Sequence, residues 1–226
     1  MRALTPKLAT EFAGTFVFLT VIGLSSAAGP LAPLAIGLSL MAMVYMGGHV
    51  SGAHYNPAVS FGLFLRRIIG AQTMLAYWAV QVIAGVLAFI FAHLVSGRTA
   101  GVHAVAAWPA ALAAEVVFTA ALVLVVLNVA ATKQTEGNSF YGLAIGMTIA
   151  AGAFVAGPLS GGVFNPAVGI GGILIDGLVG VGSWSSLWLY LVGPLAGSGI
   201  AAAIHHMQTP PAETVPPETS ESTRLP

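Results

Sequence analysis

The feature that most constrains this fold is an internal repeat whose two copies keep a constant spacing. LAIGLS at 34–39 returns as LAIGMT at 143–148, and SGAHYNPAVSFG at 51–62 returns as SGGVFNPAVGIG at 160–171, each 109 positions later. An unchanged offset, with Asn-Pro-Ala-Val in both copies, indicates a duplication. The sequence therefore predicts two halves with the same internal structure.

Long apolar runs show which solvent surrounds these halves. Hydrophobic residues make up 57% of the 226-residue chain and charged residues only 6%, against about a quarter in soluble domains. The six long apolar runs are approximately 8–28, 31–49, 72–95, 108–131, 139–157 and 186–206. Each is close to the roughly 20 residues that cross a bilayer as a helix. The composition predicts an all-α membrane protein with six transmembrane helices.

The repeat and the spans together fix the topology. Each half, about 8–95 and 108–206, holds three spans, and because three is odd the second half enters the membrane from the opposite side. Such a 3+3 inverted repeat has a pseudo-two-fold axis in the membrane plane. We expect one transmembrane channel domain over 1–207 and a disordered tail over 208–226, which is rich in Pro, Thr and Glu.

Each half carries an Asn-Pro-Ala segment between its second and third spans. The segments are Asn56, Pro57, Ala58 and Asn165, Pro166, Ala167. Asn caps a helix and Pro fits its first turn, but the apolar stretch that follows, up to Leu65 or Leu174, is too short to span. The sequence predicts two re-entrant half-helices. Irregular backbone at membrane depth is tolerated only along a cavity, so Val50–Tyr55 and Pro158–Phe164 are expected to line a pore.

The half-helices predict the electrostatics of that pore. Both point their N-termini, each with about half a positive charge, at the midplane. If Asn56 and Asn165 cap with their carboxamide oxygens, their NH2 groups are left as donors toward the lumen. A passing hydroxyl can then accept but not donate, and cations meet a barrier. The expected acceptors are the loop carbonyls of Gly52, Ala53, His54, Gly161, Gly162 and Val163.

These motifs resemble a known family. E-x-x-G-T at 11–15, G-H-V-S-G-A-H-Y-N-P-A-V at 48–59 and the second Asn-Pro-Ala are similar to the aquaporin and aquaglyceroporin (major intrinsic protein) family, over about 8–206. The resemblance implies passive conduction, a homotetramer with one pore per subunit, and a central constriction at Asn56 and Asn165.

One departure from the family pattern bears on selectivity. Family members usually carry Arg directly after the second Asn-Pro-Ala, where this chain has Val168. By motif, the narrow outer filter of this chain would consist of Ile36, Ala153, Gly162 and Val168. That filter is wide and apolar. The expected solutes are small and uncharged: glycerol-like polyols and metalloid hydroxides such as arsenite, with water as a further candidate.

Several polar residues within or beside the spans have two readings. Glu11 and Glu115 could brace the re-entrant loops by accepting amide hydrogens, or form a proton relay; their symmetry favours bracing. His49 and His54 are read as packed, loop-bracing residues, with a pH gate as the alternative. Asp176 is expected to be solvated at the outer end. His205 and His206 should lie at the interface, with adventitious metal binding as the alternative.

The distribution of cations sets the orientation. With the N-terminus inside, six cations are cytoplasmic and only Arg98 is outside, which obeys the positive-inside rule. The six are Arg2, Lys7, Arg66, Arg67, Lys133 and Arg224. We expect a multi-pass protein of the cell (inner) membrane with both termini cytoplasmic.

Other function classes receive less support. Inverted repeats also occur in secondary transporters, and an apolar filter could dewet and leave a non-conducting structural tetramer. An enzyme is not expected, because no nucleophile, base and orienting group converge. No cofactor or metal site is expected, and without a basic run no nucleic acid partner; the expected partners are membrane lipid, a small neutral solute and further copies of the chain.

Overall fold

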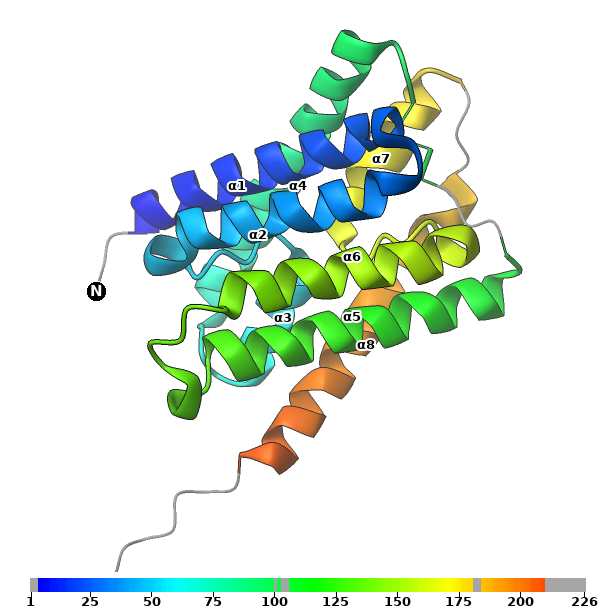
Figure 1. Cartoon of the computed structure of the whole chain (residues 1–226). Coiled ribbons are helices and arrows are strands. Elements are labelled where there is room, and N and C mark those ends of the chain that lie inside the picture. The colour runs from blue at the N-terminus through cyan, green and yellow to red at the C-terminus, as the bar shows by residue number, and fades with distance from the viewer. Residues whose placement is uncertain (1–3, 100, 103–105, 181–183, 210–226) are drawn as a thin grey trace, which may run out of the picture.

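The computed structural model describes residues 4–99, 101–102, 106–180 and 184–209, which are almost entirely helical (Figure 1). The α-helices are α1 (Leu4–Leu24), α2 (Ala32–Ser51), α3 (Pro57–Leu65), α4 (Ala71–Ser96), α5 (Trp108–Ala130), α6 (Tyr141–Ser160), α7 (Pro166–Leu178) and α8 (Leu187–Gln208). Short 3-10 turns cover Ser25–Leu31, Lys133–Thr135 and Trp184–Ser186. The expected tail, 208–226, lies outside the described residues from residue 210 on, and Gln208 is the last residue of α8.

Six of these helices are membrane spans. Five continuous helical stretches of the described chain are long and apolar enough to cross a membrane, and the first, Leu4–Ser51, contains both α1 and α2. Those two helices lie side by side (Figure 1), because the chain turns back through a 3-10 segment at Gly29, where φ is +53°. The predicted six spans and two short re-entrant helices, α3 and α7, are confirmed.

Three predicted boundaries were wrong by a few residues. The first span ends at Leu24 rather than at residue 28, because the 3-10 turn begins before Gly29-Pro30. The re-entrant loops were placed too early, since α2 continues through Ser51 and α6 through Ser160. The following glycines, Gly52 (φ +92°) and Gly161 (φ +88°), end these helices in the left-handed conformation that a residue with a side chain adopts at a cost.

The two halves interlock around a central crossing. α1 packs on α4 as α5 packs on α8, while α2 and α6 pack against each other. A Cβ on Gly37 would lie 2.5 Å from the carbonyl oxygen of Gly146, so this crossing depends on small residues. Each half-helix also packs on the last helix of the other half, α3 on α8 and α7 on α4. The interior is thereby built from both repeats.

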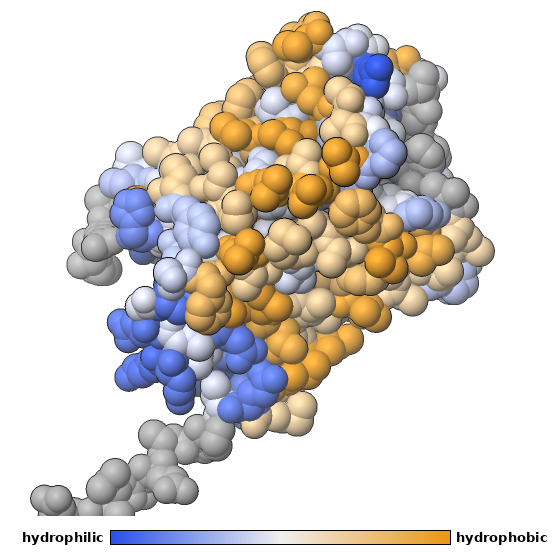
Figure 2. Space-filling view, viewed as in Figure 1, coloured by the Kyte–Doolittle hydropathy of each residue, from blue (hydrophilic) through white to orange (hydrophobic). Residues whose placement is uncertain are grey.

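Large apolar side chains remain exposed on the flanks. Leu75, Ile83 and Val117 are more than half exposed. In Figure 2 hydrophobic residues cover the middle of the visible face, and hydrophilic residues gather at the end where the chain leaves α8. A broad apolar surface of this kind fits a lipid environment.

Candidate functional site: a pore between the two halves

The Asn-Pro-Ala segments start the half-helices with the local chemistry that the sequence predicts. The Asn56 side chain accepts a hydrogen bond from the Ala58 N–H (2.8 Å), and the Asn165 side chain accepts one from the Ala167 N–H (2.9 Å). The proline that follows each asparagine occupies the first turn. The preceding residues, Tyr55 and Phe164, both have φ of +49°, and this turns each chain sharply into its half-helix.

The two loops are tied to each other by the same asparagines. Asn56 Nδ2 donates to the carbonyl oxygen of Phe164 at 2.9 Å, and Asn165 Nδ2 donates to that of Tyr55 at 3.0 Å. Each NH2 group therefore uses one hydrogen to link the loops, and its second hydrogen remains available as a donor. The NH2 groups are therefore only partly available as donors to the lumen, because each spends one hydrogen on the opposite loop.

Two buried glutamates hold the loops from behind. Glu11 Oε1 accepts from the His54 N–H (2.9 Å) and the Ser51 hydroxyl (2.6 Å), and its Oε2 accepts from the Tyr55 N–H (2.8 Å). Two of these donors are backbone N–H groups of the loop, so the carboxylate fixes the loop backbone. Its fourth partner is Gln81, whose Nε2 lies 2.9 Å from Oε2.

The second half repeats this arrangement with one partner fewer. Glu115 accepts from the Ser160 hydroxyl (2.6 Å) and from the N–H groups of Val163 (3.0 Å) and Phe164 (2.7 Å). No side chain of the described residues takes the role that Gln81 has in the first half. Sequence analysis overlooked Gln81, although a single amide within an apolar span is itself a signal of a buried polar contact.

A cavity of about 240 Å³ runs between the two halves, many times the roughly 10–15 Å³ that one water needs. It is lined by both asparagines and by all four proposed filter residues, Ile36, Ala153, Gly162 and Val168. Ala53, His54, Gly161 and Val163 also lie on its wall. Among the described residues of this wall, none carries a formal charge.

A second cavity continues toward the end of the molecule that holds both termini of the helical bundle. Gly52 and His49 line it, together with the connection between α5 and α6, and Ile145 lines both cavities. The two cavities therefore follow one another along one path. His49 is exposed and lines this cavity, whereas His54 is buried with its Nδ1 2.9 Å from the Ser60 hydroxyl.

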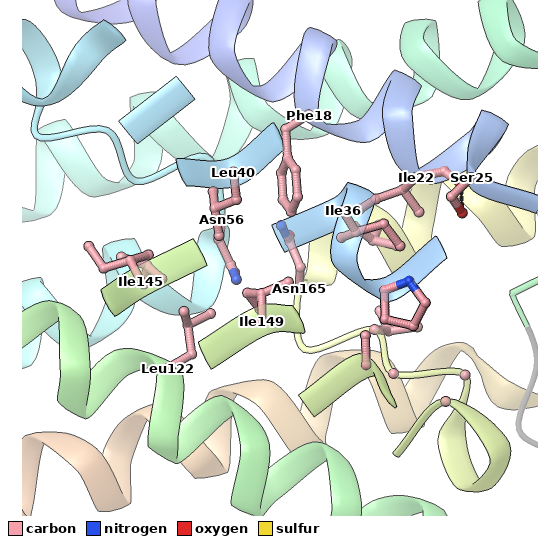
Figure 3. Close-up of a pocket in the computed structure, with 18 of the residues that line it drawn as sticks. Phe18, Ile22, Ser25, Ile36, Leu40, Asn56, Leu122, Ile145, Ile149 and Asn165 are labelled. Atoms are coloured by element: carbon pink, nitrogen blue, oxygen red, sulfur yellow. Dashed lines mark hydrogen bonds between the residues drawn. The ribbon is translucent and has the colours of Figure 1, made fainter. Parts of the chain in front are cut away.

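Much of the wall consists of apolar residues that the sequence analysis did not assign. Figure 3 shows Phe18, Leu40, Leu122 and Ile149 around the space into which the amides of Asn56 and Asn165 point. The sequence held a signal for them. Phe18 follows Glu11 by seven residues, as Leu122 follows Glu115, and a spacing of seven keeps two residues on one helix face.

At the outer end, Asp176 differs from its expected position. Asp176 is only 4% exposed and accepts a hydrogen bond from the Val102 N–H at 3.3 Å. Val102 lines the pore cavity, so the carboxylate anchors a connecting segment over the pore mouth. The prediction of a solvated Asp176 was wrong, because the carboxylate is buried and bonded to the backbone of Val102.

Comparisons with known proteins agree with this geometry. The family model described as "Major intrinsic protein" matches residues 3–205. The chain is 34% identical to probable aquaporin TIP3-2 of Oryza sativa subsp. japonica, over 96% of this chain and 86% of the relative. It is 36% identical to aquaporin NIP1-4 of the same plant, over 86% and 74% of the two chains. The solved aquaglyceroporin from Plasmodium falciparum has the same fold, with a TM-score of 0.77, 19% identity, and coverage of 90% of this chain and 96% of that one.

Proposed function

This chain belongs to the major intrinsic protein family, and we propose that its pore passes uncharged solutes wider than water, such as glycerol-like polyols and metalloid hydroxides including arsenite. The relatives are channels, which supports a passive channel for small solutes and not an enzyme. The observation that carries the finer proposal is Val168, which lies on the pore wall where the family pattern has Arg.

The chemistry of the wall supports this class of solute. Near Val168 the wall side chains are Ile36 and Ala153, which neither donate nor accept hydrogen bonds. The polar groups of the wall are the loop carbonyls, which accept, one amide hydrogen each from Asn56 and Asn165, which donate, and the side chains of Ser25 and His54. A polyol or an undissociated hydroxide satisfies both kinds of group, whereas an ion would lose its hydration shell against an uncharged wall.

The experiment introduces at position 168 the guanidinium that the family pattern has there. In vesicles, Val168→Arg is expected to reduce glycerol and arsenite flux by at least tenfold while it reduces water flux much less, because the larger side chain narrows the pore and adds a charge. Val168→Ile serves as the control that narrows the pore without charge or donors. Equal loss of water and glycerol flux in Val168→Arg would contradict the filter assignment.

Flux measurements also separate the two alternatives. A passive channel gives flux that rises in proportion to the solute gradient, whereas a secondary transporter saturates and depends on an ion gradient. A structural tetramer gives swelling rates equal to those of empty vesicles. Because no charged side chain lies on the described pore wall, we expect the first result.

Assembly and orientation form part of the same proposal. The whole pore is built within one chain, which fits one pore per subunit of a homotetramer. Lys7, Arg66, Arg67 and Lys133 all lie at the end where α1 begins and α8 ends, and Arg98 lies at the other end. This distribution supports cytoplasmic termini in a cell membrane.

A further inference from the structure

A basic pocket lies outside the pore, where the half-helix α3 ends beside the last turns of α8. Its lining residues are Leu65, Arg66, Arg67, Ala202, Ala203 and His206. The hollow measures about 510 Å³, which is large enough for a phosphate group with its ester substituents. No acidic side chain is among its described lining residues.

Arg66 is held rigidly in this pocket by neutral partners alone. Its Nε donates to His205 Nδ1 (2.9 Å), and its two terminal nitrogens lie 3.0 Å from His206 Nδ1 and 2.9 Å from the Thr209 hydroxyl. Since arginine only donates, both Nδ1 atoms accept in these contacts, and Nε2 of each ring carries the hydrogen. In the described part of the chain no carboxylate pairs with this half-buried guanidinium, which keeps two further N–H donors.

Arg67 occupies a position where the backbone favours glycine. The Arg67 N–H donates to the Phe64 carbonyl (2.8 Å) and the Ile68 N–H to the Leu63 carbonyl (2.9 Å), the two bonds of a Schellman motif. Arg67 itself has φ of +58°, which is costly for a residue with a Cβ. Its exposed side chain makes no hydrogen bond or ion pair with the described residues. The chain thus retains a cation where the fold alone would prefer glycine.

The surroundings of the pocket are those of a lipid headgroup. Leu65 is 40% exposed, Ile68 46% and Met207 73%, so apolar side chains flank the two arginines. Charge for a phosphate and apolar surface for an acyl chain therefore lie together at this pocket. Basic pockets at the cytoplasmic ends of spans are known to hold anionic headgroups.

We propose that this pocket binds the phosphate of an anionic phospholipid, with Arg66, Arg67 and the His206 Nε2–H as donors. Charge-assisted hydrogen bonds from guanidinium groups are among the strongest contacts that a phosphate makes. The site is independent of the pore and of the solute proposed above. His205, which binds Arg66, also lies 2.9 Å from the Thr132 hydroxyl through its Nε2. Thr132 lines the second cavity, so the pocket is linked to the connection between α5 and α6.

The test uses a variant that removes the charge and relieves the backbone. Arg67→Gly is expected to melt at the same or a higher temperature than the wild type in lipid-free detergent, because glycine suits the left-handed position. In native mass spectrometry it should bind phosphatidylglycerol about tenfold more weakly, because one charge-assisted hydrogen bond is lost. Lys133→Gln is the matched control, since it removes one exposed cation at the same end of the molecule, outside the pocket.

Three results would overturn the proposal. One is wild-type binding of phosphatidylglycerol by Arg67→Gly. Another is an equal loss in Lys133→Gln, which would show that general surface charge, not the pocket, attracts the lipid. The last is inorganic phosphate raising the melting temperature as much as phosphatidylglycerol does, which would identify a site for free phosphate. The proposal holds if phosphatidylglycerol stabilises the wild type and Lys133→Gln more than phosphatidylcholine or phosphate does, and if this difference is smaller in Arg67→Gly.

Discussion

Gly14 does not line the pore, but we predict that a side chain at this position disturbs the pore loops. An added Cβ at Gly14 would lie 2.1 Å from Tyr55 Cε1 and 2.2 Å from Cζ, about 1.5 Å inside an ordinary carbon contact. The Tyr55 ring is fully buried and its hydroxyl donates to the Met43 carbonyl (3.0 Å). Its backbone binds Glu11 on one side and Asn165 on the other. Gly14→Ala must therefore move the residue that joins the two pore loops.

The size of this effect follows from three terms. Overpacking costs about 1–3 kcal/mol, and loss of the Tyr55–Met43 hydrogen bond costs about 1 kcal/mol. The higher helix propensity of alanine returns about 1 kcal/mol. The net destabilisation is about 2 kcal/mol, or roughly thirtyfold in the ratio of folded to unfolded protein.

The assay compares Gly14→Ala with Gly199→Ala. Gly199 also lies within a helix, α8, but a Cβ there meets nothing within 4 Å, so this control should be at least as stable as the wild type. Unfolding in mixed micelles measures stability, and vesicle swelling measures glycerol flux. If Gly14→Ala unfolds and conducts like Gly199→Ala, Tyr55 does not hold the pore in the manner described.

Two further changes test the supports of the loops and the pore mouth. Glu115→Gln keeps the side-chain shape but leaves the N–H of Val163 or Phe164 without an acceptor, which should destabilise the fold by about 1–3 kcal/mol. Unfolding of this variant in mixed micelles at the same midpoint as the wild type would contradict this. Asp176→Ala removes the acceptor of the Val102 N–H, so the peptide containing Val102 should exchange deuterium faster, and an unchanged exchange rate would refute the anchoring role.

The repeat and the half-helices could be predicted because their signals are local. Asn followed by Pro suits the start of a helix, and the 109-residue offset places the second copy without any tertiary information. An odd number of spans in each half then leaves one topology. These inferences need only chain chemistry and the thickness of the bilayer.

The contacts that depend on which helices meet could not be predicted in this way. The sequence shows that Asp176 follows an apolar run, but only the fold brings Val102 over it. The same holds for Arg66, whose partners His205, His206 and Thr209 lie about 140 residues away. In the sequence, Arg66 counted only as one of the cations that set the membrane orientation. Its contacts with α8 are seen only in the structure.

The residues that line the pore are related by the internal repeat, and this relation separates selection by solute size from exclusion of charge. With an offset of 104 for α1 and α5, and of 109 for the later elements, the lining residues pair as Phe18 with Leu122, Ile22 with Val126, Ile36 with Ile145, Leu40 with Ile149, and Val59 with Val168. Both members of each of these five pairs are apolar, so these parts of the wall offer no side chain that could replace the hydration of an ion. The polar groups belong mainly to the two loops, which the glutamates fix. We therefore expect changes at Val168 to alter which uncharged solutes fit, and changes at the loops to alter whether charge is excluded at all.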